Sequence, residues 1–440
     1  MPLKSRSMGE EAPRRMKTND EVIDRRPGIP RWQHGAIFLI ACAVVFSRRP
    51  DALTNPQFWA EDGHIWFADA YNLGWWDALL RPEVGYYQTL PRLVASLALL
   101  LPLSRAPLLL NLAALALQAL PVNILLSSRL TAFGTTRFRA LMAITYLVLP
   151  NCPEICANIT NAQWVLALSA LLLLVASPPI DNVGLCFDLL TVLLCGLTGP
   201  FCILLLPIAI YLAFKRHGAW RWMTSFVLVA CSLIQAWGLL VVNPAARTSW
   251  GVLGATPGLF IRIIAGNIFF GALLGTNELA EVSRPWFFCF LLFIVIVGVA
   301  IVADAYVHSV IEMKLFILFA AMIVAASLLS PTAYALPGVT KWQQLAAASG
   351  VRYWFFPSLA FLWSLLLCAK SRASIGKIVP ACLLLLLCFG IAFRWRRPAF
   401  QNLNFSEAAQ RFEAVPEGTV AIFPENPSGW NMKLVKHRSR

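Results

Sequence analysis

Residues 106–127, APLLLNLAALALQALPVNILLS, carry no charged side chain. About 20 predominantly apolar residues allow one helix to span the hydrocarbon core of a bilayer. Further apolar segments follow along most of the chain, at 35–47, 88–103, 139–151, 163–177, 184–197, 201–214, 222–242, 259–275, 285–303, 314–330, 354–369 and 378–393. The sequence therefore predicts an all-α polytopic membrane protein with about 11–13 transmembrane helices, some of them too short to cross as straight helices.

The amino-acid composition excludes an ordinary soluble protein. Of 440 residues, 58% are apolar and 13% are charged, whereas soluble domains have roughly 45–50% and 25%. The net charge is +14, but Lys and Arg lie in the polar head and in short gaps between apolar segments, as the positive-inside rule requires. We therefore expect a multi-pass protein of the inner (cytoplasmic) membrane with a cytoplasmic N-terminus and no nucleic acid partner.

The chain divides into three predicted parts. Residues 1–33 form a polar head that we expect to be cytoplasmic and disordered, 34–393 form the transmembrane domain, and 394–440 form a small C-terminal extramembrane segment. Alternating apolar residues over 419–423 predict a strand-bearing lobe in that segment. About eleven crossings would place the tail outside, although the arginines that follow residue 393 favour the inside.

The positive-inside assignment meets a conflict between two basic and polar stretches. Residues 48–86 form the first outside loop, and the basic gap Arg129 to Arg139 is assigned to the inside. Two apolar segments lie between them, and two full crossings would return the chain to the side that it left. One of the two segments, or a breaker such as Pro102 or Pro121, must therefore do something other than span.

The first outside loop is predicted to contain interfacial helices. Trp59, Trp66, Ala70 and Leu73 recur at helical spacing. This pattern predicts a short helix along the membrane interface, with its aromatic face in the lipid headgroups. Acidic side chains of the loop would thereby be held at the lipid boundary.

Glu61 and Asp62 are the acids of this loop with the clearest chemical potential. Neighbouring residues lie about 100° apart around a helix, so both cannot point at one substrate atom. One acid can act while the other orients it or faces solvent. A carboxylate held there suits a general base that takes the proton of an attacking hydroxyl, and a solvated acidic pair explains the residues equally well.

The motifs that follow the acids complete a longer pattern. They are GYY at 85–87, PR at 91–92, PNCPE at 150–154, NITNAQW at 158–164, GVRYWFFP at 350–357 and PSGWNMKL at 427–434. Their order and spacing resemble the GT-C superfamily of membrane glycosyltransferases, which take sugars from polyprenyl-phosphate donors. The loops at 150–164 and 350–357 look like those of uncharacterised bacterial members. The resemblance covers most of the chain, while each motif alone is loose.

The resemblance implies roles for individual residues. An acid of the first outside loop is the catalytic base in GT-C enzymes, which maps to Asp62 or Glu61. Arg92 and the pair Arg352-Tyr353 then become candidates for the lipid phosphate, since guanidinium groups bind phosphate oxygens in a bidentate manner. A snorkelling side chain explains Arg92 slightly better, and an interfacial anchor explains Arg352 equally well.

The loop at 150–164 contributes four further candidates. Glu154 occupies the place of the second acid found in the superfamily, outside an Asp-containing motif. Asn158, Asn161 and Gln163 can bind sugar hydroxyls, although helix capping and turns explain them nearly as well. The resemblance leaves room for a divalent metal as cofactor, but no ligand spacing in the sequence supports a metal site.

The sequence thus favours an integral membrane glycosyltransferase that moves a sugar from a polyprenyl-phosphate-linked donor to an acceptor hydroxyl outside the cytoplasm, with inversion. The acceptor, whether glycan, lipid or protein, is not specified, and membrane lipids are expected partners. A transporter or lipid flippase is the alternative, because Asp188 lies within an apolar run where a buried charge is costly. It can also lie in water at the cytoplasmic end of that run. A non-catalytic assembly subunit is a third interpretation.

Overall fold

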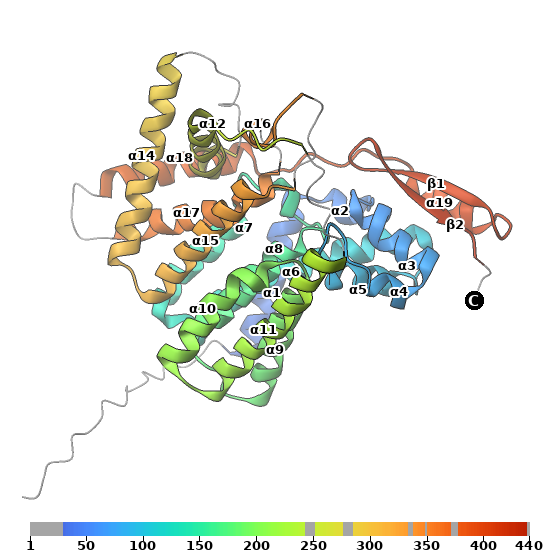
Figure 1. Ribbon diagram of the computed structural model, residues 1–440, viewed down its shortest axis with the longest axis horizontal. Helices are drawn as coiled ribbons and strands as arrows, with labels where there is room; N and C mark the ends of the chain where they lie inside the picture. Colours follow the sequence, from blue (N-terminus) through green and yellow to red (C-terminus); the bar gives the residue numbers. More distant parts are fainter. Residues whose placement is uncertain are drawn as a thin grey trace, which may run out of the picture.

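The computed structural model describes residues 30–242, 251–275, 285–332, 338–347, 350–370 and 377–437. Most of these residues are helical, and one two-stranded sheet lies near the C-terminus (Figure 1). Residues 1–29 of the predicted polar head lie outside the described residues.

The main helices of the bundle are α1 (Arg31–Arg48), α6 (Ala106–Leu126), α7 (Thr136–Leu147), α8 (Ala162–Val175), α9 (Asn182–Leu197), α10 (Phe201–Arg216), α11 (Ala219–Trp237), α14 (Pro285–His308), α15 (Ile311–Leu329), α17 (Phe355–Lys370) and α18 (Ile378–Phe393). Within the described residues, six helical stretches are long and apolar enough to cross a membrane: Leu103–Leu126, Ala219–Val242, Pro257–Leu274, Phe287–His308, Ile311–Leu329 and Val351–Lys370. The prediction of an all-α polytopic membrane protein is consistent with this architecture.

Shorter elements connect the main helices. They are α2 (Asp51–Thr54), η1 (Asp62–Phe67), α3 (Ala68–Leu73), α4 (Trp75–Leu79), α5 (Thr89–Ala98), η2 (Leu103–Arg105), η3 (Ser128–Phe133), η4 (Pro153–Ile155), η5 (Gly238–Val242), α12 (Pro257–Ile263), η7 (Ile264–Phe270), α13 (Gly271–Leu274), α16 (Lys341–Ala346) and η9 (Val351–Trp354).

The helix α5 resolves the conflict over the segment 88–103. At its start, the Leu90 N–H donates to Thr198 Oγ1 at 3.1 Å, and just after its end the Leu103 N–H donates to Glu413 Oε1 at 2.8 Å. Thr198 and Glu413 both belong to the end of the bundle that carries the first loop. The ten residues of α5 cover only about 15 Å. The segment 88–103 therefore begins and ends at this same end of the bundle, and of the two segments in conflict only α6 runs through the bundle.

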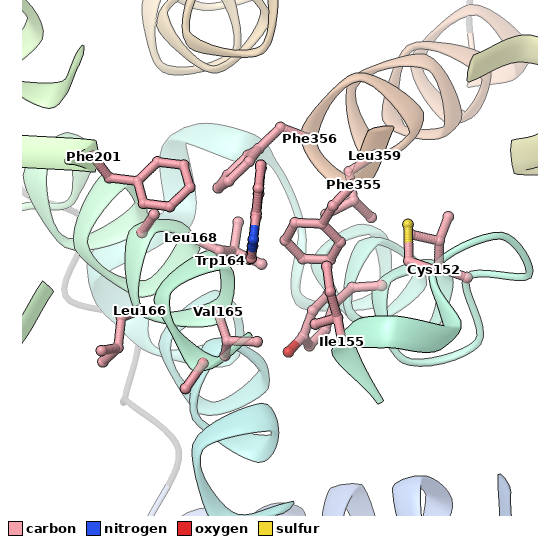
Figure 2. Packing of buried hydrophobic residues seen from close by; sticks show 14 of the residues in the cluster. Cys152, Ile155, Trp164, Val165, Leu166, Leu168, Phe201, Phe355, Phe356 and Leu359 are labelled. Carbon is pink, nitrogen blue, oxygen red and sulfur yellow. The ribbon is translucent and has the colours of Figure 1, made fainter. Parts of the chain in front are cut away.

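The core lies around α8 and α17. Every residue of α8 is buried, as expected for a helix that is apolar on all sides. Trp164 at its start packs edge-on against Phe201 of α10 at 4.8 Å and lies 6.3 Å from Phe356 of α17 (Figure 2). Because this packed layer fixes the beginning of α8, it also fixes the loop that directly precedes it.

The opposite end of the bundle carries buried ion pairs. Asp188 of α9 is fully buried and receives two hydrogen bonds from Arg129, at 2.9 and 2.6 Å. Arg216 at the end of α10 binds Glu312 at the start of α15. Asp188 is therefore neutralised by a bidentate partner and does not lie in water.

A small C-terminal lobe packs on the first loop. It consists of α19 (Phe405–Glu413), β1 (Val420–Glu425) and β2 (Trp430–Val435). The two strands pair in antiparallel orientation, with Val420 opposite Val435. The predicted alternation thus appears as a hairpin (Figure 1). Its contacts with the loop place the tail at the same end of the bundle as residues 48–86.

Candidate functional site

The first loop folds inward instead of lying flat on the membrane. Trp66 and Ala70 are each 1% exposed, and the Trp66 indole N–H donates to Thr160 Oγ1 at 2.8 Å. Trp59 stacks on Phe400 at 4.7 Å, and Leu73 is exposed. The expectation of a face that lies in the headgroups is therefore wrong for Trp66 of η1 and Ala70 of α3, because both side chains are packed inside the protein.

Asp62 is buried against the loop that precedes α8. Its Oδ1 accepts hydrogen bonds from Thr160 Oγ1 at 2.5 Å and from the Thr160 N–H at 3.2 Å. Burial raises the pKa of Asp62 to about 7, despite the hydrogen bonds from Thr160 that favour the charged form. Asp62, which is 1% exposed, thus fixes the first loop to the loop at 150–164.

Glu61 faces a different set of groups from Asp62. It is only partly buried, and its charge is influenced by both Arg352 and Glu154. Burial raises the pKa of Glu61, Arg352 lowers it, and Glu154 raises it again. Thr160 thus hydrogen-bonds to Asp62, whereas the charges of Arg352 and Glu154 act on Glu61.

Glu154 and Arg352 form an ion pair beside Glu61. Arg352 Nη1 lies 2.8 Å from Glu154 Oε2, and the side chains are 28% and 23% exposed, respectively. The guanidinium also lies 5.2 Å from the ring centroid of Tyr353. Three segments that are distant in the sequence thus bring Glu61, Glu154 and Arg352 into one partly exposed cluster, which we call the Glu61 cluster.

The other predicted residues of the loops hold the backbone in place. Asn158 Oδ1 accepts from the Thr160 N–H at 2.9 Å, and Asn161 Nδ2 donates to the Glu154 carbonyl at 3.0 Å. Gln163 is buried directly against Gly199, and the Tyr353 hydroxyl bonds to the backbone N–H of Thr332. In this conformation these side chains support the backbone of the segments that carry Glu154 and Arg352.

Arg92 belongs to a separate buried pair. Its side chain is fully buried, Nη1 lies 2.9 Å from Asp69 Oδ2, and the guanidinium is 4.9 Å from the Trp66 ring centroid. Glu83, which the sequence did not single out, responds to the charges of Arg92, Asp69 and Glu61. The side chain of Arg92 is thus closed off from solvent.

One acidic residue of the site comes from the C-terminal lobe. Glu425 of β1 is 3% exposed, and it is close enough to Asp62 and Glu61 for both carboxylates to raise its pKa. A Cβ placed on Gly63 would overlap Glu425 Oε1. The sequence carried no signal for this contact, because Glu425 comes from a distant segment of the chain.

The arrangement combines an accessible acid with an accessible guanidinium. Glu61 can accept a proton, and Arg352 can bind an anionic oxygen with the donors that Glu154 does not use. Among the residues that the structure describes, no three His, Cys, Asp or Glu side chains gather in a way that could hold a metal ion. The chemistry that these side chains offer is therefore proton transfer beside a bound anion.

Comparisons with known proteins found no relative of this chain. No protein-family model, no curated protein and no solved structure matches the chain.

Proposed function

We propose that the protein is an integral membrane glycosyltransferase that uses a polyprenyl-phosphate-linked sugar as donor and transfers the sugar to an acceptor hydroxyl on the extracytoplasmic side. The convergence of Glu61, Glu154 and Arg352 supports this proposal most directly. A carboxylate near a partly exposed guanidinium at the end of an apolar bundle is what supports it. A lipid-linked donor requires these three features together.

Glu61 is the preferred general base of the two candidate acids. It is partly exposed, whereas Asp62 is 1% exposed and its Oδ1 is occupied by Thr160. The raised pKa of Glu61 makes its carboxylate a stronger base near neutral pH. Asp62 then has the positioning role, since it fixes the loop that carries Glu154.

The proposed step is a single displacement. The acceptor hydroxyl gives its proton to the Glu61 carboxylate while its oxygen forms a bond to the anomeric carbon. The bond between that carbon and the donor phosphate breaks, and its electron pair leaves with the polyprenyl phosphate. Arg352 stabilises the departing phosphate through its free N–H groups, and the configuration at the anomeric carbon inverts.

The basic residues in the gaps between the bundle helices support the proposed orientation in the membrane, whereas Arg48, Arg49 and Arg397 lie at the Glu61 end, bonded to backbone carbonyls of residues 149–156. Arg129, Arg216 and Lys370 lie at the end opposite the Glu61 cluster, next to the ion pairs of Asp188 and Glu312. The positive-inside rule assigns this end to the cytoplasm. Since α5 does not cross, the acid cluster and the C-terminal lobe then lie outside.

The transporter alternative has less support. It relied on Asp188 as an uncompensated charge in the membrane, and Arg129 neutralises this charge with a bidentate contact. Buried pairs of this kind are common structural features at helix ends. We therefore retain transport of a lipid-linked substrate only as an outcome of the experiment below.

The experiment uses membranes that contain the full chain and a panel of synthetic polyprenyl-phosphate hexoses and pentoses, with a cell-envelope extract as the source of acceptor. We expect the wild-type protein to release polyprenyl phosphate from at least one donor. Glu61→Gln should lower this rate by about 100-fold or more, the usual contribution of a general base. Asp77→Asn is the matched control, since Asp77 is an exposed acid of the same loop.

Two outcomes would reject part or all of the proposal. One is turnover that is undiminished in Glu61→Gln at normal expression, which would reject Glu61 as the general base while leaving the transfer itself in place. The other is the absence of turnover of any donor by the wild-type chain combined with movement of a labelled donor across proteoliposomes, which would establish transport in place of transfer.

A further inference from the structure

The C-terminal lobe is attached to the first loop by backbone hydrogen bonds. The Ala60 N–H donates to the Asn426 carbonyl at 2.6 Å. Asn72 binds β2 on both sides of its amide, because Nδ2 donates to the Lys433 carbonyl at 2.8 Å and Oδ1 accepts from the Val435 N–H at 3.0 Å. The hairpin therefore covers the segment that carries Glu61 and Asp62.

Glu425 is an unusual residue at the centre of this contact. It is 3% exposed, and neither of its carboxyl oxygens has a side-chain hydrogen-bond partner among the described residues. The backbone N–H of His64 lowers the pKa of Glu425, but burial and the nearby carboxylates outweigh this effect. Burying a carboxylate without a charged partner is costly, so this position favours the protonated, uncharged form.

The carboxyl group of Glu425 packs against Gly63. The φ angle of Gly63 is not in the left-handed region, so its backbone does not require glycine. Glycine is required for a steric reason, since a Cβ at this position would overlap Oε1 of Glu425. Gly63 and Glu425 are therefore complementary, although they lie at opposite ends of the chain.

We propose that Glu425 is a positioning residue of the Glu61–Asp62 site, whose buried carboxyl, packed on Gly63, holds the C-terminal hairpin against the first loop. This role deepens the proposed function, and it rests on that function only in treating Glu61 and Asp62 as an active site. The fastening itself is a property of the fold and can be measured without turnover.

The groups around Glu425 determine the direction of its pH response. From the first loop, Asp62, Glu61 and His64 face it; its cross-strand partner on β2 is Trp430, and α19 contacts β1 through Phe405 and Phe412. Burial, together with the charges of Asp62 and Glu61, raises the pKa of Glu425 to about 9. A released hairpin would expose Glu425 to water, where its pKa returns to about 4.3.

The sign of the response follows from this difference. The attached state holds one more proton than the released state between these two pKa values, so attachment weakens as the pH rises and levels off above about 9. The equilibrium for release should grow by up to about tenfold per pH unit. Asp62 contributes in the same direction up to about one pH unit above its pKa of about 7, so the response between pH 8 and 9 reports most directly on Glu425.

The test is hydrogen exchange of the full-length protein in detergent at pH 7, 8 and 9, expressed as protection factors so that the intrinsic rate is divided out. The Ala60 and Val435 amides report on the attachment, because both bond across it. The Lys436 amide is the internal reference, since it bonds to Thr419 within the hairpin. In the wild-type protein, Ala60 and Val435 should lose up to about tenfold protection per pH unit while Lys436 does not.

Variants separate charge from shape. In Glu425→Gln, protection of Ala60 and Val435 should stay high and constant from pH 8 to 9, whereas Glu407→Gln, which alters an exposed acid of α19, should behave like the wild type. Gly63→Ala should reduce protection at pH 7 already. Gly258→Ala is its control, since no atom lies near an added Cβ there.

Each contrary result would overturn the role of Glu425. Constant protection in the wild type would do so without any variant, as would an equal slope in Glu425→Gln or the loss of attachment in that variant at pH 7. None of these results depends on whether a sugar is transferred, so failure of this inference and failure of the proposed function can be told apart.

Discussion

Arg352 donates from Nη1 to Oε2 of Glu154 over 2.8 Å, although 198 positions separate the two residues in the sequence. The contact joins the loop before α8 to the short turn before α17. It leaves the guanidinium 28% exposed, so Arg352 is fixed in direction but retains donors for a ligand. By contrast, the side chain of Arg92 is fully buried.

Arg352 should therefore carry most of the affinity for a lipid phosphate. We expect Arg352→Gln to weaken binding of synthetic polyprenyl phosphate by about 1.5–3 kcal/mol, the range for hydrogen bonds to charged groups. Glu154→Gln should retain binding, because it removes the competing carboxylate and leaves the guanidinium in place. Binding to the purified protein can be measured by native mass spectrometry, with the exposed Arg105→Gln as control. Equal affinity of Arg352→Gln and wild type would assign the phosphate elsewhere.

Asp62 should make the stability of the protein depend on pH. Its pKa is raised from 3.8 to about 7 in the folded protein, so the folded state binds more protons than the unfolded state between these values, and stability falls as the pH rises through this range. Asp62→Asn should remove this dependence. Relative to wild type, its free energy of unfolding should rise by about 1.4 kcal/mol per pH unit from pH 4 to 7 and then level off.

The thermal midpoint of the detergent-purified protein, followed from pH 4 to 8, measures this difference. Asp77→Asn serves as the matched control and should follow the wild type, because Asp77 is exposed. A constant offset between Asp62→Asn and wild type at every pH would show that Asp62 does not change protonation in this interval.

Arg92 should matter for stability through Asp69. Arg92→Met should cost about 3 kcal/mol, since it leaves a partly buried carboxylate with only the more distant and exposed Arg81 as partner. The double variant with Asp69→Asn should recover much of this loss, because neither charge then remains. Arg81→Met is the control: it alters a 58% exposed arginine 3.8 Å from the same carboxylate, and exposed pairs contribute less than about 1 kcal/mol.

Thermal unfolding of the four proteins provides the comparison. Should Arg92→Met be as stable as wild type and lose affinity for polyprenyl phosphate, Arg92 would be a ligand-binding residue, as the GT-C resemblance implied.

Local properties of the sequence determined the class of the protein and most of its helices. Uninterrupted apolar segments such as 106–127 mark membrane-spanning helices because a bilayer leaves the backbone no other partner for its hydrogen bonds. Alternation over 419–423 predicted a strand for a similar reason, since successive side chains of a strand point to opposite faces. Its pairing with a second strand was not predicted.

Only the tertiary structure decided how these elements meet. An apolar segment has the same composition whether it crosses or returns, and the contacts of α5 with Thr198 and Glu413 showed that it returns. Likewise, nothing near Asp62 in the sequence identifies Thr160 as its partner, and nothing near Gly63 identifies Glu425. These pairs depend on packing between segments that are far apart in the chain, which hydrophobic periodicity does not encode because it reports on each element separately.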